Sequence, residues 1–203
     1  MRVSVFDYGA GNLHSLAKAL MSPDVELVIE TDPVRATDTD VLVLPGVGAF
    51  GAAAARLAAG REAMRDAILG GLPTIGVCLG MQLLFEGSDE GEGAGLGIIA
   101  GRVTGLRAAR VPHIGWNTVE PAESGELSVA PPTMVYYANG FACRPAAESV
   151  VAAWTTHEAD RFPAVVRAGT AVGVQFHPEK SSAPGVRFLR ELLTSALTWR
   201  TTP

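Results

Sequence analysis

The turn Gly76-Val77-Cys78-Leu79-Gly80 follows an apolar run at residues 72–75 and precedes a helical pattern of apolar residues at 81–85. A strand that runs into a Gly-x-Cys-x-Gly turn and then into a helix is typical of a nucleophile elbow, here with a thiol in place of the usual hydroxyl. The two glycines let the chain turn sharply without a Cβ clash. The turn is expected to place Cys78 at the start of a helix, where the helix dipole favours the reactive thiolate. The alternative is a buried cysteine that only fills space, so this interpretation requires a base and an oxyanion site elsewhere in the chain.

The first half of the chain alternates short apolar strands with helical patterns. The strands are expected at residues 3–6, 25–29, 41–44 and 73–77, and the helices at 13–20 and 52–69. The run at 41–44 is apolar throughout, as expected for a central parallel strand that is buried on both faces. This βαβ series predicts a doubly wound α/β sheet with right-handed crossovers.

The second half has a different pattern. A Gly-rich stretch at 88–105 is typical of a loop, and an amphipathic helix is expected at 187–199. Short β-like pieces broken by Pro and Gly are expected to add antiparallel strands to the sheet, at 116–119, 134–141, 150–155, 164–167 and 171–176. Because no internal repeat or linker divides the chain, residues 1–203 are predicted to form a single domain.

Composition excludes several classes of function. The chain has 203 residues, a hydrophobic fraction of 48% and a net charge of −5, so it can build a full core and lacks the basic character of a nucleic-acid-binding protein. It has no apolar run of about 18 residues for a membrane span and no signal peptide. Cys78 and Cys143 are therefore expected to be free thiols in the cytoplasm, and no metal site is expected from so few cysteines.

A base for the thiol is predicted at His177, within Gly173-Val174-Gln175-Phe176-His177-Pro178-Glu179. The apolar strand delivers His177 at its end, and in an extended chain the side chain of Glu179 faces the same way. Glu179 is then expected to hold one imidazole nitrogen and to leave the other for Cys78. His113 has no neighbouring carboxylate, and His157 lies in a polar stretch typical of a solvated hairpin tip.

The oxyanion site is predicted in the loop Leu44-Pro45-Gly46-Val47-Gly48-Ala49-Phe50, which leaves the strand at 41–44. Loops at the carboxyl ends of parallel strands are where such sheets bind ligands. The bare backbone of this loop can aim one N–H at a developing oxyanion, and the N–H of Leu79 would supply the second donor. A dinucleotide site at Gly9-Ala10-Gly11-Asn12 is not supported, because the third glycine of that motif would fall at His14.

Together these elements resemble the class I (triad) glutamine amidotransferases and, within them, the glutaminase subunits of imidazole glycerol phosphate synthase. The motifs that carry the resemblance span nearly the whole chain: Asp7-Tyr-Gly-Ala-Gly-Asn12, Leu44-Pro-Gly-Val-Gly-Ala-Phe-Gly51, Gly76-Val-Cys-Leu-Gly-Met-Gln-Leu-Leu-Phe85, Val111-Pro-His-Ile-Gly-Trp-Asn117 and Gly173-Val-Gln-Phe-His-Pro-Glu-Lys-Ser181. The first, second and last motifs favour this subunit over related glutaminases.

The resemblance implies a flavodoxin-like three-layer sandwich with a mostly parallel central sheet and added antiparallel strands. It implies that Cys78 attacks the side-chain amide of glutamine, that His177 and Glu179 complete the triad, and that no cofactor takes part. The backbone near Val47 and Leu79 would stabilise the oxyanion. Gly46, Gly48 and Gln82 would line the glutamine site.

The resemblance also implies a partner, because glutaminases of this family pass ammonia to a cyclase subunit with a (β/α)8-barrel fold in a heterodimer. Trp116, Tyr136 and Tyr137 are the aromatic residues predicted to lie at that interface, although packing in the core is the alternative for each. One departure from the family occurs at Asn139, where a histidine is common in the segment beside the glutamine pocket and the partner.

Two other functions remain open at this point. One is the glutaminase subunit of a different amidotransferase, such as anthranilate or aminodeoxychorismate synthase. The other is a thiol hydrolase or peptidase built on the same sheet.

Overall fold

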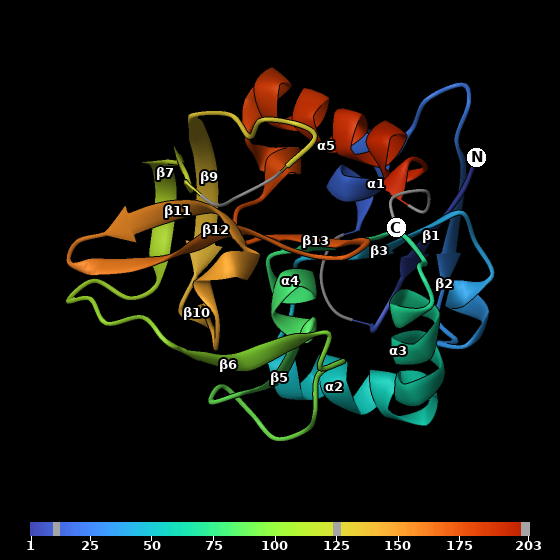
Figure 1. The fold of residues 1–203 in the computed structure, drawn as a ribbon, viewed down its shortest axis with the longest axis horizontal. Coiled ribbons are helices and arrows are strands. Elements are labelled where there is room, and N and C mark those ends of the chain that lie inside the picture. The colour runs from blue at the N-terminus through green and yellow to red at the C-terminus, as the bar shows by residue number, and fades with distance from the viewer. Residues whose placement is uncertain (10–12, 124–126, 200–203) are drawn as a thin grey trace.

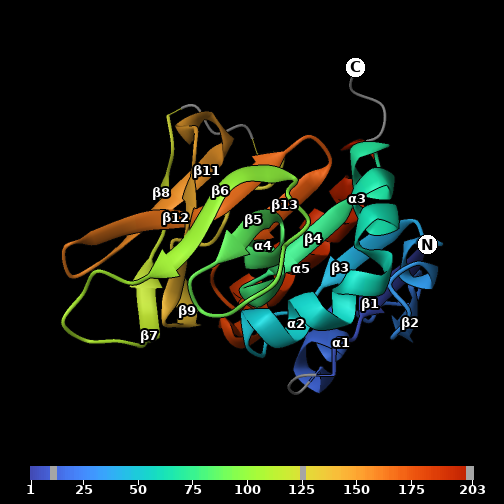
Figure 2. The same cartoon turned by 90° about the horizontal axis from the view of Figure 1, so that it is seen from below.

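The computed structural model describes residues 1–9, 13–123 and 127–199. Ala10, Gly11 and Asn12 of the first motif therefore lie outside the described residues. The chain forms a three-layer α/β sandwich around one large sheet, with two smaller sheets at one end (Figures 1 and 2). The doubly wound, flavodoxin-like class predicted from the sequence is confirmed.

The main sheet has eight strands in the order β2-β1-β3-β4-β13-β12-β11-β8. Its first five strands are parallel: β2 (Glu26–Glu30), β1 (Arg2–Phe6), β3 (Val41–Leu44), β4 (Thr74–Val77) and β13 (Ala171–Val174). The last three are antiparallel to their neighbours: β12 (Asp160–Ala168), β11 (Val151–His157) and β8 (Glu120–Pro121). The prediction for the segment 171–176 is half right, because β13 pairs antiparallel with β12 on one edge but in parallel with β4 on the other.

The two faces of the sheet are covered by separate sets of helices (Figure 1). On one face, α1 (His14–Leu20) and α5 (Ser182–Ala196) pack on apolar residues of β1, β3 and β13. On the other face lie α2 (Phe50–Leu57), α3 (Arg61–Leu69) and the short α4 (Leu79–Leu83). Burial of strand β3 on both sides is the physical reason for its uninterrupted apolar sequence, and β4 beside it is fully buried as well.

The predicted helix at 52–69 is divided in two. A 3₁₀ turn, η2 (Ala58–Gly60), separates α2 from α3. A Cβ at Gly60 would lie 2.6 Å from Cγ of Pro33, in the loop before η1 (Arg35–Thr37). The close approach of that loop leaves room only for glycine at the break.

The stretch predicted as a loop is partly β structure. A three-stranded sheet is formed by β10 (Phe141–Pro145), β6 (Ile99–Gly105) and β5 (Phe85–Ser88). The helix after Cys78 therefore ends at Leu83, and Phe85, which was expected to continue it, begins a strand that pairs with Ile99. This pairing depends on contacts remote in the sequence, which a local helical pattern does not reveal.

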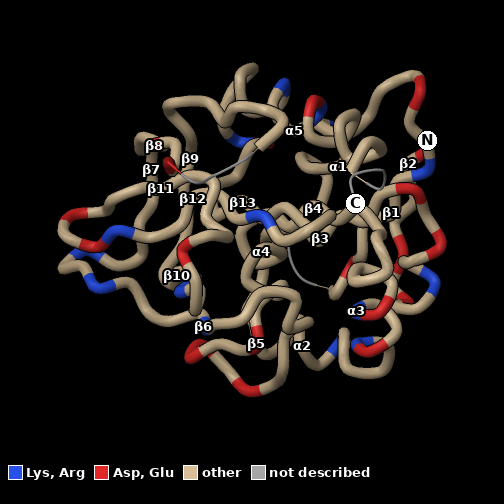
Figure 3. Tube along the Cα trace, in the orientation of Figure 1, with Lys and Arg blue, Asp and Glu red and all other residues tan. Residues whose placement is uncertain are grey.

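The third sheet is an antiparallel pair, β7 (His113–Thr118) and β9 (Met134–Asn139), at the end of the molecule away from β2 (Figure 2). Two further single turns occur, η3 (Glu148–Val150) and η4 (Pro178–Lys180). Acidic and basic residues are scattered over many elements instead of gathering on one face (Figure 3). Within the described ranges, none of the helices has the length and apolar character needed to cross a bilayer.

Candidate active site

Cys78 occupies a strained turn between β4 and α4. Its φ of 47° and ψ of −102° lie in a region that residues with a side chain seldom adopt. The turn is held by two backbone hydrogen bonds: the N–H of Cys78 donates to the carbonyl of Val174 at 2.7 Å, and its carbonyl accepts from the N–H of Gln82 at 3.1 Å. These bonds lift the side chain off the sheet at the carboxyl end of β4.

The two glycines of the motif are required by packing. A Cβ at Gly76 would lie 2.6 Å from the carbonyl oxygen of Gly80, and a Cβ at Gly80 would overlap the carbonyl of Leu44 on the adjacent strand β3. Any side chain at either position would push α4 away from the sheet. The Gly-x-Cys-x-Gly spacing therefore sets how closely the turn approaches the sheet, as the sequence indicated.

His177 and Glu179 form a buried pair three to five residues after the end of β13. His177 Nδ1 lies 2.8 Å from Glu179 Oε1, and the two side chains are only 2% and 6% exposed. Because an ionised carboxylate only accepts, Nδ1 is the donor, which leaves Nε2 for a second partner. Glu179 lies in the 3₁₀ turn η4 and not in the extended chain predicted from the sequence, yet its side chain still reaches the imidazole.

The β7–β9 sheet also fixes the position of His177, through its backbone. The N–H of His177 donates to the carbonyl of Tyr136 on β9 at 2.8 Å. Ser181 then ties the two segments together, because its Oγ donates to the carbonyl of His177 at 2.7 Å and accepts from the N–H of Tyr136 at 2.9 Å. The base is therefore held between the main sheet and β9.

Cys78 and His177 interact electrostatically. Burial alone would lower the pKa of His177, but hydrogen bonding to Cys78, the charge of Cys78, and the hydrogen bond and charge of Glu179 outweigh it and raise the pKa to about 10. Such a histidine is an imidazolium at neutral pH. A cationic imidazole beside a cysteine is the setting in which such a nucleophile reacts.

A cavity of about 180 Å³ opens over this pair. All five residues predicted for the oxyanion and substrate site line it, together with Cys78 and His177; they are Gly46, Val47, Gly48, Leu79 and Gln82. Gly48 has a φ of +124°, and a Cβ at Gly46 would lie 3.1 Å from Cε1 of His177. The loop after β3 therefore approaches the imidazole as bare backbone.

Several residues of the site were missed by the sequence analysis. Besides the catalytic residues, Glu90 and Lys180 contribute charged groups to the lining of the cavity, and Glu90 also accepts a hydrogen bond from the N–H of Phe50 at 2.9 Å. Gln175 is fully buried and donates to Sγ of Cys78 at 3.5 Å. Alternation along the strand places Gln175 on the face of His177, which is a signal that could have identified it.

Asn139, which stands where a histidine is common in the family, also lines the cavity. Its side-chain amide donates to the carbonyl of Phe141 at 3.0 Å, and the residue is 4% exposed. The structure thus uses this position to hold the end of β9 against the start of β10. No group of three or more His, Cys, Asp or Glu side chains suited to a metal ion occurs among the described residues.

The predicted interface aromatics differ from one another in their surroundings. Trp116 is 51% exposed on β7 and meets Tyr136 edge to face, with ring centroids 6.1 Å apart. Tyr137 is fully buried and packs on His113, Phe162 and Phe176. The prediction of Tyr137 as an interface residue is therefore wrong, because alternation along β9 turns it into the core.

Two of the other histidines stack on each other. His113 lies in β7, and its ring also stacks on Tyr137. His157 lies at the predicted hairpin tip, opposite Asp160, but it is half-buried there against His113, with ring centroids 4.0 Å apart. Burial, followed by the charge of His157, lowers the pKa of His113 to about 4, so His113 is neutral at physiological pH.

A strained cysteine facing a buried His–Glu pair, at the carboxyl edge of a flavodoxin-like sheet, defines the class of thiol-nucleophile enzymes on an α/β sandwich. The family profile described as "Glutamine amidotransferase class-I" matches residues 4–195. The chain belongs to the class I glutamine amidotransferases and, among them, to the family of imidazole glycerol phosphate synthase subunit HisH.

Named relatives are similar over almost their whole length. The "Imidazole glycerol phosphate synthase subunit HisH" of Symbiobacterium thermophilum is 42% identical, covering 93% of this chain and 91% of its own. The protein of the same name from Methanopyrus kandleri is 40% identical, covering 97% and 99%.

Solved structures agree on the fold. A chain described as "Crystal structure of glutamine amidotransferase" superposes with a TM-score of 0.73 at 20% identity, covering 96% of this chain and 98% of its own. The "Structure of PurLQS from Thermotoga maritima" gives a TM-score of 0.69 at 18% identity, with 98% of both chains covered.

Proposed function

We propose that this chain is the glutaminase of an imidazole glycerol phosphate synthase and hydrolyses glutamine to glutamate and ammonia at Cys78. The observation that carries the proposal is the pairing of Cys78, on its strained turn, with the buried His177–Glu179 pair under one cavity. Membership of the HisH family favours this activity over that of other amidotransferases and of thiol peptidases.

In the first half of the reaction, Sγ of Cys78 attacks the carboxamide carbon and forms the C–S bond. The carbonyl oxygen becomes an oxyanion, and the N–H groups of Val47 and Leu79 are the donors we assign to it. The C–N bond then breaks as Nε2 of His177 gives its proton to the departing amine, which leaves as ammonia. Glu179 stays ionised and keeps the proton-transferring nitrogen oriented toward the substrate.

In the second half, neutral His177 takes a proton from a water molecule. The hydroxide attacks the thioester, the C–S bond breaks, and glutamate leaves. The thiolate and the imidazolium are restored together, and the new carboxylic acid ionises, so one water and one glutamine give one glutamate, one ammonia and one proton. No cofactor is required, because every proton transfer in this sequence uses the same imidazole.

We assign substrate orientation to Glu90 and Lys180. A bound glutamine carries an α-ammonium and an α-carboxylate at the end remote from its carboxamide. The carboxylate of Glu90 matches the first and the ammonium of Lys180 the second, and both residues line the cavity. Paired charges at that end would leave the carboxamide to point at Cys78.

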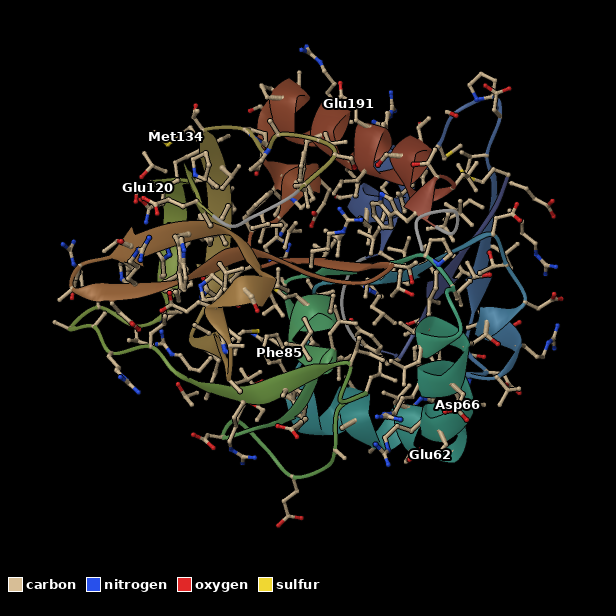
Figure 4. All side chains as sticks on the ribbon, in the orientation of Figure 1. Glu62, Asp66, Phe85, Glu120, Met134 and Glu191 are labelled. Carbon is tan, nitrogen blue, oxygen red and sulfur yellow. The ribbon has the colours of Figure 1, made fainter. Side chains whose placement is uncertain are left out.

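We further propose that residues 1–203 act as one domain in the cytoplasm and deliver ammonia to a (β/α)8-barrel cyclase subunit in a heterodimer. Ammonia released into neutral water becomes ammonium, which is not a nucleophile, so the user must lie against the site. The surface that best suits a partner is the β7–β9 sheet, where Ile114, Trp116 and Met134 are 64%, 51% and 48% exposed. Met134, at the start of β9, is labelled in Figure 4. Exposed apolar and aromatic residues of this kind form interface cores.

The test is Cys78→Ala, assayed in the complex with the cyclase subunit. Glutamine-dependent synthesis should be abolished, because no nucleophile remains, whereas synthesis from added ammonia should continue at the wild-type rate. Equal loss of both activities would show that the assigned division of labour is wrong. Peptide cleavage by the wild-type chain without glutamate release would instead support a thiol peptidase.

A further inference from the structure

Gln175 is a fully buried side chain that contacts the nucleophile directly and has no role in the reaction described above. It lies between the end of β13 and His177, and its backbone N–H donates to the carbonyl of Ala164 on β12 at 2.9 Å. Its side-chain Nε2 donates to Sγ of Cys78 at 3.5 Å. A buried amide that contacts a reactive sulfur needs a reason beyond filling space, because burying it unpaired would be costly.

The orientation of this amide follows from a backbone carbonyl. The carbonyl oxygen of Phe141 can only accept, and Gln82 Nε2 lies 3.3 Å from it, so this end of Gln82 is the donor. The same Nε2 lies 3.4 Å from Gln175 Oε1, which must accept. Gln175 therefore turns its Nε2 toward Cys78, and the chain Phe141–Gln82–Gln175–Cys78 runs in a single donor direction.

This direction has a chemical consequence at the sulfur. An amide nitrogen donates and does not accept, so Sγ of Cys78 is the acceptor on the side of Gln175. A thiol proton has no acceptor on that side, and on the other side Nε2 of His177 accepts it when the imidazole is neutral. The contact thus favours the thiolate and directs the proton of any thiol toward the base.

We propose that Gln175 is a positioning residue for the glutaminase reaction: its side-chain amide holds Sγ of Cys78 in place and stabilises the thiolate, and Gln82 sets its orientation. This inference rests on the proposed function of Cys78 as nucleophile. It also gives Gln82 two roles, because its Nε2 is used within the protein and its Oε1 remains to accept an N–H of bound substrate. A substrate that donates to Oε1 of Gln82 would polarise this amide, and through it would strengthen the hydrogen bond from Gln175 Nε2 to Sγ of Cys78.

The test is Gln175→Met, which keeps the length of the side chain and removes the donor, together with Gln175→Leu, which also removes the donor and carries no polar atom. At pH 7 the alkylation of Cys78 by iodoacetamide, followed by peptide mass spectrometry, should slow about tenfold, equivalent to about 1.4 kcal/mol. The kcat for glutamine hydrolysis should fall by a similar factor, while KM stays within about twofold.

The matched control is Thr74→Val on β4, which removes another buried hydrogen bond, from Oγ1 to the carbonyl of Leu72. It should lower the free energy of unfolding but leave alkylation and kcat unchanged. Wild-type alkylation and kcat in either folded Gln175 variant would overturn the proposal. Glutaminase activity that survives Cys78→Ala would instead remove the proposed function itself, so the two failures are distinguishable.

Discussion

Replacing Glu179 by Gln tests how the buried pair activates the site. The hydrogen bond from His177 Nδ1 to Glu179 Oε1 is 2.8 Å long, and with side chains 2% and 6% exposed it is little screened by solvent. A hydrogen bond to a charged group contributes about 1.5–3 kcal/mol, and one pKa unit corresponds to about 1.36 kcal/mol. The substitution should therefore lower the pKa of His177 by about 1–2 units from its value of about 10.

The sign of the effect on activity follows from the role of the imidazolium. His177 must be protonated to give its proton to the departing ammonia, so activity is lost as pH rises through the pKa of His177. In the wild type this alkaline limb should lie near pH 10, and in Glu179→Gln it should move down by about 1–2 units. At pH 10, kcat should fall by about 5- to 50-fold relative to the wild type, because only about one imidazole in ten to one in a hundred is still protonated, whereas at pH 8 the loss should be no more than about twofold.

The assay is glutamate release as a function of pH, with Glu191→Gln as the control for loss of an exposed carboxylate on α5. The control should keep the wild-type profile. An unchanged alkaline limb, with a kcat at pH 10 within about twofold of the wild type in Glu179→Gln, would refute the reasoning, because it would mean that the carboxylate does not set the protonation of His177.

Three further predictions concern packing, substrate binding and the partner. Gly80→Ala should destabilise the fold by about 1–3 kcal/mol or more in urea unfolding, because its Cβ would overlap the carbonyl of Leu44, whereas Gly105→Ala, with open space around it, should have little effect. Glu90→Gln should raise KM for glutamine about tenfold with little change in kcat, since the amide keeps the hydrogen bond to the backbone but loses the charge that pairs with an α-ammonium. Trp116→Ala should weaken binding of the cyclase subunit by at least about tenfold in titration calorimetry without lowering the melting temperature, because an exposed tryptophan adds little to the fold; unchanged affinity would show that the partner binds elsewhere.

The elements that carry the chemistry could be read from the sequence because their signals are local. The glycines of the Gly-x-Cys-x-Gly turn indicate that two backbone segments lie very close together. The contact between Gly80 and Leu44 is that close approach. The strand at 41–44 is buried on both faces and is therefore apolar throughout. His177 was identifiable because a carboxylate two residues on can reach its ring.

The errors arose where structure is decided by residues far apart in the chain. The helix at 52–69 breaks at Gly60 because Pro33 packs against it, and Phe85 leaves the helical pattern to pair with Ile99. The position of β13 beside β4, between the two halves of the sheet, cannot be read from either strand alone. The pattern of a short strand does not show which neighbour it will have.

The exposure of side chains around the nucleophile could not be predicted from the sequence either. Tyr136 and Tyr137 are adjacent in the sequence, yet one is half-buried near Trp116 and the other is fully buried. Their aromatic character is equal, and only the pairing of β9 with β7 decides which of them faces the core. Glu90 lines the cavity because the loop after β5 folds back to the N-terminus of α2.

The central claim is that Cys78 carries the acyl group of the substrate during turnover. Mixing the protein with its cyclase partner and glutamine, quenching in acid within milliseconds, and analysing peptides by mass spectrometry tests it most directly. The account predicts a glutamyl thioester on the peptide that contains Cys78 and none on the peptide that contains Cys143. Steady release of glutamate with no adduct on Cys78, or with the adduct on another residue, would contradict it.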